Sequence, residues 1–281
     1  MPELPEVQTT VNGLNRTVRG RRIVSVSTTY GSSYHAGKDN IKNPEFFKSF
    51  KKIVAGQKIL KAERRAKNIL IRLSNGYTIL VHMKMTGHFV YDQPRYPFTR
   101  LDITLNNDKH LVLSDMRKFA KVTVVKSPEE YLAHLGPEPL EKNFQFKIFN
   151  FQLMKRPKAK IKTTLLDQTL IAGIGNIYSD EILWRANVHP ESRVAKIPNE
   201  NIRLMFKAMK EVLRAGINFG GDSMSDYRNI KGERGKFQEH HKAYQQTDKK
   251  CQKNSCSGII KRIIVGARSA HFCPIHQKLY V

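Results

Sequence analysis

The last 31 residues of the chain contain four residues whose types and spacing suit a metal ion. Two cysteines are separated by four residues, sixteen residues follow, and a cysteine and a histidine are then separated by two residues. Thiolates and imidazoles are the ligands that zinc prefers in tetrahedral protein sites, and four protein ligands leave no position open for water. We therefore expect one structural Zn²⁺ bound by Cys251, Cys256, Cys273 and His276.

His271 is a competing fourth ligand, although it lies only two residues from Cys273. Two ligand pairs at the ends of a short insert predict a β-hairpin over residues 259–272, and the turn of this hairpin presents Arg268. Three cysteines are an odd number and form a poor disulfide framework, which favours a reducing compartment and a local metal site.

The N-terminus carries a second group of residues that could do chemistry. Pro2 is a small second residue, so we expect Met1 to be removed, which would give Pro2 a free secondary amine. A neutral amine near a helix N-terminus is a nucleophile that forms an imine with a carbonyl-level carbon. Glu3 stands beside it as a proton shuttle, and Glu6 lies one helical turn further on. The alternative interpretation of these residues is an ordinary helix cap.

The chain is strongly basic, with 49 Lys and Arg against 24 Asp and Glu among 281 residues and a formal net charge of +25. This excess points to a polyanionic partner, and we expect nucleic acid. Hydrophobic residues make up 40% of the chain, which excludes a disordered basic tail. No segment approaches the ~20 apolar residues of a membrane span, and the first residues do not resemble a secretion signal. We therefore expect a cytoplasmic protein without a membrane partner.

Two kinds of periodicity place the candidate residues on secondary structure. A buried helix is predicted to begin within four residues of the N-terminus, because Pro5 suits the first turn and apolar residues recur at helical spacing from Val7 to Val18. Short apolar runs between turn clusters then predict the strands of an antiparallel β-sandwich at 68–73, 77–83, 101–105, 110–114 and 121–125.

The period changes near residue 130. Three prolines in the charged stretch 127–142 mark a boundary, and helical stripes follow at 144–154 and 202–213. Between these stripes, glycines lead into Asn176, which we expect to be an N-cap followed by an acidic first turn at Asp180 and Glu181. Residues 220–250 are polar, contain glycines and lack a period, which predicts a long mobile loop.

Six motifs occur in a fixed order between residues 2 and 277. They are Pro2-Glu3-Leu4-Pro5-Glu6-Val7, Arg64-Arg65-Ala66-Lys67, the run 82–87, Asp115-Met116-Arg117-Lys118-Phe119, the run 173–178 and the terminal cysteine and histidine pattern. In this combination the chain resembles the formamidopyrimidine-DNA glycosylase family. Six ordered matches over nearly the whole chain are far more specific than any one of them.

The resemblance implies an α+β fold in three parts. The expected domains are an N-terminal antiparallel β-sandwich with a flanking helix at 1–128, a helix-two-turn-helix domain with a lesion-recognition loop at 129–245, and a zinc-finger β-hairpin at 246–281. In the family, DNA binds between the two halves. The change of period near residue 130 agrees with such a division.

The resemblance also implies an activity in base-excision repair. The expected substrate is double-stranded DNA containing oxidised purines such as 8-oxoguanine and formamidopyrimidines. Pro2 would attack C1′ of the damaged nucleotide, expel the base and form a Schiff base, with Glu3 as proton donor and acceptor. Because an imine acidifies the neighbouring proton, AP-lyase cleavage by β- and δ-elimination follows from the same intermediate. We expect a monomer associated with the nucleoid.

Further positions match the family's DNA contacts. The phosphate contacts correspond to Lys67, His82, Asn176 and Arg268. Lys67 and Arg268 are also candidate proton donors. Tyr178 matches a further DNA-binding position. The gap left by the flipped nucleotide would be filled by Met85, Arg117 and Phe119. Alternatively, Lys67 and Arg268 are solvated surface side chains. Met85 and Phe119 would likewise belong to the core. The loop 220–237 is similar to the family's lesion-reading loop, with lesion contacts at Glu6, Ser223 and Tyr227.

The chain also departs from the family pattern. His276 stands where the family usually has cysteine, and the first ligand pair is spaced by four residues instead of two. Gln8, Met116 and Lys118 replace other common residues, and the insert 32–48 has no counterpart that we can interpret. Two alternatives stay open: an endonuclease VIII-like glycosylase for oxidised pyrimidines, and a non-catalytic damage-binding zinc protein. The length of the loop 220–237 favours a purine reader.

Overall fold

The computed structural model describes residues 1–224 and 226–281, and they form two compact units. Unit 1 contains 1–133 and 219–236, and unit 2 contains 134–218 and 237–281. The segment 219–236 therefore packs with the N-terminal unit, although the division predicted from the sequence places it with the helices. The boundaries at 128 and 245 stay a prediction.

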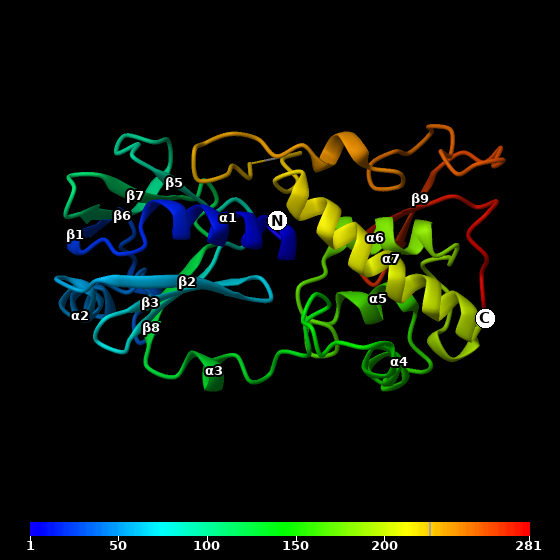
Figure 1. Cartoon of the computed structure of the whole chain (residues 1–281), viewed down its shortest axis with the longest axis horizontal. Helices are drawn as coiled ribbons and strands as arrows, with labels where there is room; N and C mark the ends of the chain where they lie inside the picture. Colours follow the sequence, from blue (N-terminus) through cyan, green and yellow to red (C-terminus); the bar gives the residue numbers. More distant parts are fainter. Residues whose placement is uncertain (225) are drawn as a thin grey trace. The chain divides into compact units, whose positions relative to one another are not determined.

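Unit 1 is an antiparallel β-sandwich, as the sequence predicts (Figure 1). One sheet has the strand order β1 (Ile23–Thr28), β6 (Thr99–Leu105), β7 (His110–Ser114) and β5 (His88–Tyr91). The other has the order β2 (Ile59–Arg65), β3 (Asn68–Leu73), β4 (Thr78–His82) and β8 (Lys121–Val125). Apolar residues of both sheets form one buried core. The sequence patterns predicted the five strands β3, β4, β6, β7 and β8, but they missed β1, β2 and β5.

Helix α1 (Leu4–Thr17) contacts strands of both sheets. Its apolar residues recur at helical spacing and are buried, among them Val7, Val11 and Leu14. The helix begins with a capping box, in which the Glu3 side chain accepts from the third helical N–H and the Glu6 side chain accepts from the Glu3 N–H. Both the helix and its cap are confirmed, and the reciprocal cap fixes the backbone that follows Pro2.

The insert at 32–48 folds against the sandwich. It contains a 3-10 turn, η1 (Ser33–His35), and leads into helix α2 (Pro44–Val54), which the sequence patterns missed. The Asn43 side chain caps α2 by accepting from the Glu45 N–H, and Pro44 occupies the first turn. Ile41 of the insert is 1% exposed and joins the core of unit 1. A short helix, α3 (Pro128–Tyr131), ends the N-terminal part of the unit.

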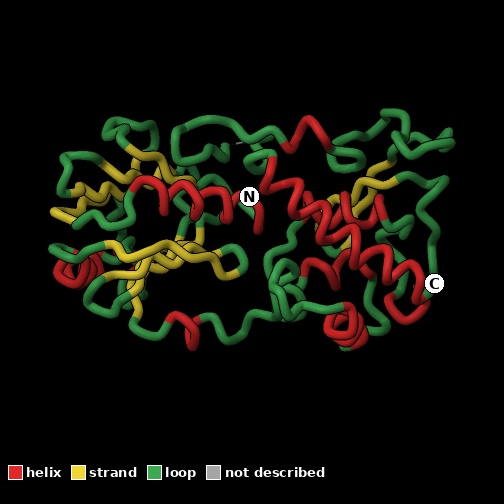
Figure 2. The backbone as a smooth tube through the Cα atoms, viewed as in Figure 1, coloured by secondary structure: helices red, strands yellow, loops and turns green. Residues whose placement is uncertain are grey.

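Unit 2 is helical except for one hairpin, as the red and yellow segments of Figure 2 show. Its helices are α4 (Phe146–Met154), α5 (Ile161–Leu166), α6 (Asn176–Arg185) and α7 (Asn199–Asn218), with 3-10 turns η2 (Val194–Lys196) and η3 (Phe237–His240). The N-cap of α6 is Gly175, so the prediction of Asn176 as N-cap is wrong by one residue. The predicted acidic first turn is also wrong, because Asp180 and Glu181 lie in the middle of the helix and are buried.

The predicted terminal hairpin is confirmed. Strands β9 (Lys261–Val265) and β10 (Arg268–Phe272) pair antiparallel, and Gly266 and Ala267 form the two-residue turn with φ of 56° and 60°. Two consecutive residues with positive φ are what a type I′ turn requires, and this turn matches the twist of the strands. None of the described helices has the length and apolar character that a bilayer crossing requires.

Candidate active site and nucleic-acid interface

The N-terminal residues of unit 1 form a buried acidic corner. Pro2 is buried, and Glu3 and Glu6 are 2% and 1% exposed. The Glu6 carboxylate accepts the Glu3 N–H at 2.7 Å with one oxygen and the Asp222 N–H at 2.8 Å with the other. Glu6 therefore ties the residues beside Pro2 to the loop that contains Asp222.

That loop is anchored within unit 1. It closes where the Lys236 N–H donates to the Phe219 carbonyl at 2.8 Å, and the Tyr227 hydroxyl donates to the Glu6 carbonyl at 3.0 Å. The Ser223 hydroxyl is fully buried and donates to the Tyr227 carbonyl at 2.8 Å. The predicted lesion contacts Glu6, Ser223 and Tyr227 thus lie together beside Pro2, and their polar groups hold the loop. Part of the predicted lesion loop, residue 225, lies outside the described residues.

Lys67 and His82 lie together on the second sheet. Lys67 follows Ala66 in the β2–β3 turn and is 6% exposed, so it is not the solvated surface lysine of the alternative interpretation. Its neighbour Asn68 pairs with His82 across the β-ladder. Burial, with the charges of Lys84 and Lys67, lowers the pKa of His82 to about 3. The ring is therefore neutral at pH 7.

The tautomer of His82 follows from its hydrogen bond. Its Nδ1 accepts the Lys84 N–H at 3.0 Å, so the proton of the neutral ring is on Nε2. An Nε2–H group beside a buried lysine donates well to an anionic oxygen, whereas the ring has no free lone pair with which to bind a cation. This pair suits a phosphate.

Met85, Arg117 and Phe119 form one surface cluster, which we call the wedge cluster. Met85 and Phe119 are 39% and 49% exposed, so the interpretation of these two residues as core is wrong. The Arg117 guanidinium donates to the Met85 sulfur at 3.4 Å and lies 5.0 Å from the centre of the Phe119 ring. Two exposed apolar side chains around a guanidinium are what the insertion of side chains into a base stack requires.

A buried carboxylate that the sequence patterns missed supports the wedge cluster. Asp115 is fully buried and accepts hydrogen bonds from the hydroxyls of Tyr30 and Thr86 and, at 2.7 Å, from the Ala120 N–H. Thr86 in turn accepts the Arg117 N–H at 3.0 Å. Asp115 therefore joins the two loops that carry the cluster. Its only signal in the sequence was its position in the fourth motif.

In unit 2, Asn176 and Arg268 lie close to one another. The Asn176 amide donates to the hydroxyl of Ser269, next to Arg268, at 3.2 Å. The amide oxygen of Asn176 is buried and has no hydrogen-bond partner among the described residues. Arg268 is exposed at the hairpin turn, as predicted. Tyr178 is fully buried and stacks on Phe237 with ring centres 5.0 Å apart, so its ring packs inside unit 2, and its predicted DNA contact stays a prediction.

Two acidic residues of α6 hold neighbouring segments of unit 2. Asp180 forms a buried ion pair with Lys162 and accepts the His271 N–H at 2.9 Å. Glu181 accepts backbone N–H groups from Lys242, Ala243 and Tyr244. Helix α6 thus anchors β10 and residues 242–244. The segment 220–250, predicted to be a long loop, is therefore held by hydrogen bonds in its first half, through Lys236 and Phe219, and in its second half, through Glu181.

The four predicted metal ligands converge in unit 2. The ligand atoms of Cys251, Cys256, Cys273 and His276 all lie within 4.8 Å of one another. Three of the pairs are 3.4 Å (Cys251 Sγ to His276 Nδ1), 3.5 Å (Cys256 Sγ to Cys273 Sγ) and 3.7 Å (Cys256 Sγ to His276 Nδ1) apart. Zinc bonds of about 2.0–2.3 Å give tetrahedral ligand atoms about 3.4–3.8 Å apart, so these residues can hold a metal ion.

The histidine of this cluster has the tautomer that a metal ligand needs. His276 Nε2 lies 3.1 Å from the Trp184 carbonyl oxygen and can only donate to it, which leaves the Nδ1 lone pair directed at the sulfur atoms. The competing ligand His271 instead directs Nδ1 to Asp180 at 2.9 Å. Within the described residues, His276 and not His271 therefore completes the cluster that can hold a metal ion.

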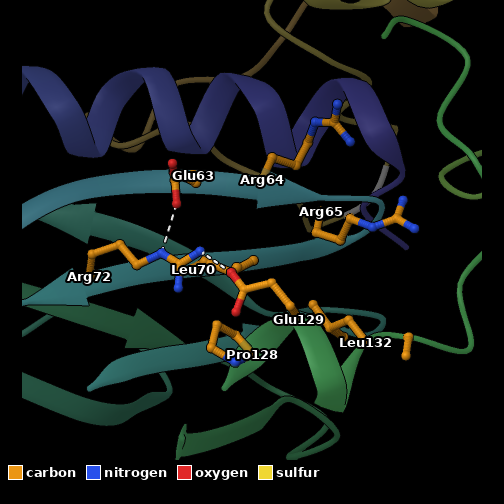
Figure 3. Close-up of a pocket in the computed structure, with 9 residues that line it drawn as sticks. Glu63, Arg64, Arg65, Leu70, Arg72, Pro128, Glu129 and Leu132 are labelled. Atoms are coloured by element: carbon orange, nitrogen blue, oxygen red, sulfur yellow. Dashed lines mark hydrogen bonds and ion pairs between the residues drawn. The ribbon is translucent and has the colours of Figure 1, made fainter. Parts of the chain in front are cut away.

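A separate pocket of about 310 Å³ lies beside the β2–β3 hairpin and α3 (Figure 3). Arg72, one of the residues that line the pocket, is paired with Glu63 at 2.7 Å and with Glu129 at 2.6 Å. These two carboxylates neutralise Arg72, and none of the residues predicted to do chemistry lines the pocket. It has no part in the site described above.

The chain matches two family models and several proteins over nearly its whole length. Residues 1–122 match the formamidopyrimidine-DNA glycosylase N-terminal domain, and residues 135–228 match the formamidopyrimidine-DNA glycosylase H2TH domain. The chain is 35% identical over 286 residues to the formamidopyrimidine-DNA glycosylase of Protochlamydia amoebophila and 37% identical over 282 residues to that of Herpetosiphon aurantiacus. Each alignment covers 99% of this chain and 100% of the relative.

Solved structures agree with these matches. The chain is similar to a complex between the Lactococcus lactis Fpg and DNA with an abasic site, with a TM-score of 0.87, 32% identity, and coverage of 98% of this chain and 99% of that chain. It is equally similar to a complex of a mutant of that protein with Fapy-dG DNA, with a TM-score of 0.87, 33% identity, and coverage of 99% and 100%.

Proposed function

The chain belongs to the formamidopyrimidine-DNA glycosylase family, and on this premise we propose that it excises oxidised purines from double-stranded DNA and cleaves the strand as an AP lyase. The observation that carries the proposal is the acidic corner around Pro2. The residue that Met1 removal would make the N-terminus, the carboxylate proposed for proton transfer and the loop proposed to read the lesion belong there to one compact unit.

In the proposed mechanism, removal of Met1 exposes the secondary amine of Pro2. The amine attacks C1′ of the damaged nucleotide, the bond from C1′ to the base breaks, and the base leaves with a proton. Glu3 transfers the protons that open the sugar and complete an iminium ion between Pro2 and C1′. Glu6 is a positioning residue, because both of its oxygens hold backbone N–H groups.

Strand cleavage follows from the same intermediate. The iminium ion withdraws electrons from C1′, which acidifies the proton on C2′ and permits β-elimination of the 3′ phosphate. A second elimination then releases the 5′ phosphate, and hydrolysis of the imine frees Pro2. Lys67 and Arg268 are candidate donors for the leaving phosphates as well as phosphate contacts.

DNA binding is divided among three sets of residues in this proposal. Lys67 and His82 of unit 1, and Asn176 and Arg268 of unit 2, bind phosphates. The wedge cluster fills the gap left by the extruded nucleotide, and Arg117 faces the orphaned base. The remaining basic residues supply a sequence-independent attraction to duplex DNA.

The cysteine and histidine cluster binds one structural zinc ion in this proposal. Its donor set suits zinc, and the four ligands leave no coordination site for chemistry. The metal would fix the hairpin that presents Arg268. We further propose that the protein acts as a monomer and is associated with the nucleoid in the cytoplasm, where its DNA substrate lies.

Covalent trapping tests the proposal. Sodium borohydride reduces an imine to a stable amine, so the mature protein is expected to become cross-linked to duplexes that contain 8-oxoguanine or an abasic site. Glu3→Gln retains the amine but lacks the proton shuttle. Because an abasic site already offers an aldehyde, this variant should be trapped on abasic DNA and not on 8-oxoguanine DNA.

Intact-mass measurement of the same sample establishes whether Met1 has been removed. A protein that lacks Met1 and binds both duplexes without ever forming the covalent adduct would overturn the enzymatic proposal. It would leave a damage-binding protein instead. Equal release of thymine glycol and 8-oxoguanine would contradict the assignment to purines.

A further inference from the structure

The loop between β7 and β8 has an unusual backbone at the wedge cluster. Residues Asp115 to Lys118 form a turn closed by a hydrogen bond from the Lys118 N–H to the Asp115 carbonyl at 3.3 Å. Lys118 has a φ of 58°, in the left-handed region that non-glycine residues seldom adopt. Such a conformation persists only where the surrounding structure holds it. This residue lies between Arg117 and Phe119, so its conformation sets the directions of both side chains.

The group that holds Lys118 comes from the uninterpreted insert. The Lys42 ammonium donates to the Lys118 carbonyl at 2.5 Å, and Lys42 is only 7% exposed. The same ammonium lies 5.2 Å from the centre of the Tyr30 ring, whose hydroxyl donates to Asp115 at 3.0 Å. Lys42 and Tyr30 therefore contact both ends of the turn that carries Arg117.

The insert in turn fixes Lys42 on each side. The Ile41 N–H donates to the Val122 carbonyl of β8 at 3.1 Å, and the Lys42 N–H donates to the Asn40 side chain at 3.2 Å. The next residue, Asn43, caps α2. A lysine whose backbone is held this way loses little further freedom when its side chain binds a carbonyl, which makes it an effective brace.

We propose that Lys42 and Tyr30 are positioning residues that brace the 115–119 turn, so that the wedge cluster is ready to enter the DNA when the damaged nucleotide leaves it. The inference rests on the proposed function, because it assigns the brace to the insertion step. The insert 32–48 would then serve the reading of the orphaned base and not the chemistry at Pro2.

The step to measure is insertion of the wedge cluster opposite the lesion. A duplex with a tetrahydrofuran abasic analogue facing 2-aminopurine reports unstacking of the orphaned base as a rise in fluorescence. Lys42→Met keeps the length and apolar stem of the side chain but leaves the Lys118 carbonyl without its donor. We expect the rise to be about tenfold slower in this variant, the effect of one lost charge-assisted hydrogen bond.

A second readout separates positioning from general damage. Single-stranded abasic DNA has no orphaned base, so borohydride trapping on it should proceed at the same rate in Lys42→Met and in the unaltered protein. The ratio of activities opposite cytosine and opposite adenine should change, because Arg117 loses its fixed direction. A merely structural role would slow trapping on both kinds of DNA and leave the ratio unchanged.

Three matched variants complete the test. Lys38→Met alters a lysine of the same insert that lies over the Tyr34 ring, and it should leave the fluorescence rate unchanged. Lys42→Arg retains a cationic donor and should recover part of the rate. Tyr30→Phe removes only the hydroxyl that Asp115 accepts and should slow the rise by less than Lys42→Met does.

The outcomes distinguish the two proposals. No fluorescence rise and no trapping with the unaltered protein would overturn the proposed function. A normal rise in the unaltered protein, with the same rate and the same base ratio in Lys42→Met, would overturn the brace. If Lys42→Met does not fold, an unchanged rate in Tyr30→Phe would overturn it instead.

Discussion

Each compact unit uses one buried aspartate to hold a segment that presents an arginine, but the two aspartates have different partners. Asp115 accepts its hydrogen bonds from two hydroxyls and a backbone N–H, all neutral, beneath the turn that carries Arg117. Asp180 is paired with the ammonium of Lys162, which is fully buried, and with His271 of the strand that begins at Arg268.

The difference reflects how much structure surrounds each arginine. The Arg117 turn lies between strands of a sandwich with a large apolar core, so Asp115 beneath it needs only neutral donors, and the charged donor at this turn, Lys42, binds the Lys118 carbonyl instead. The Arg268 hairpin has two strands of five residues, and an isolated hairpin of this size is marginal in water. It is held on one side by the hydrogen bonds of His271 to Asp180, the acid of the buried ion pair, and on the other by the cysteine and histidine cluster. Charged and metal-binding groups therefore stabilise this hairpin in place of an apolar core.

Metal removal should have the largest effect and should fall on one unit. Structural zinc contributes about 10 kcal/mol or more of apparent binding free energy in small domains. This is far more than the stability of an isolated two-stranded hairpin, which is marginal in water. Chelation is therefore expected to remove amide-exchange protection from 261–272 while β6 and β7 keep theirs. Trp184 is the single tryptophan of the chain and bonds His276 through its carbonyl, so its fluorescence should change at the same time.

Hydrogen-exchange mass spectrometry on the same protein before and after chelation gives the comparison directly. Unchanged protection of 261–272 in the metal-free protein would mean that the ion pair alone supports the hairpin. Loss of protection in both units would mean that they are not independently held.

Isosteric changes at the two aspartates should differ in cost. Asp180→Asn leaves the Lys162 ammonium buried without its counter-charge, and we expect a loss of about 3–5 kcal/mol in unfolding free energy. Asp115→Asn leaves only neutral groups less well satisfied, and the expected loss is about 1–3 kcal/mol. Urea denaturation of both variants measures the difference, and Lys162→Met combined with Asp180→Asn should recover part of the larger loss. Equal losses at the two positions would contradict the distinction.

Acid should reveal an effect that is confined to a single side chain of unit 1. The pKa of His82 is about 3 in the folded protein and near 6.5 when unfolded, so between these values the unfolded chain binds one more proton. Stability due to the neutral ring is complete above pH 6.5 and falls as the pH drops, by about 1.4 kcal/mol per pH unit. His82→Gln lacks this proton, so its stability should fall less steeply between pH 6 and 4. Parallel stability curves for the two proteins would show that the His82 ring does not stay neutral in the folded protein.

Much of this arrangement could be predicted from local patterns. Ligand spacing predicted the metal cluster and its hairpin, and short apolar runs predicted most of the second sheet, because both signals lie within a few residues of chain. Helix α2 also had a local signal, an Asn-Pro-Glu start at residues 43–45, but it lies in an insert without a recognisable motif.

The remaining features depend on distant partners. From the sequence, Asp180 and Glu181 were predicted to be the charged first turn of a helix. Their burial could not be predicted, because their partners at Lys162, Lys242 and His271 lie up to 91 residues away in the chain. Burial of a polar residue is decided by such partners and leaves no periodic signal. Likewise, Met85 and Phe119 are exposed because they lie in turns between strands. Their apolar residue types alone would predict that they are buried.

The excursion of residues 219–236 into unit 1 has a consequence for biosynthesis. The backbone passes between the two units three times, after residues 133, 218 and 236. On the ribosome, the sandwich strands emerge early, but the donor to Glu6 at Asp222 and the side chain of Ile230 that packs on Gly13 emerge only after α7. A nascent chain therefore carries its N-terminal amine long before the surrounding corner is complete. Premature termination anywhere before residue 236 would leave that amine in an unfinished pocket.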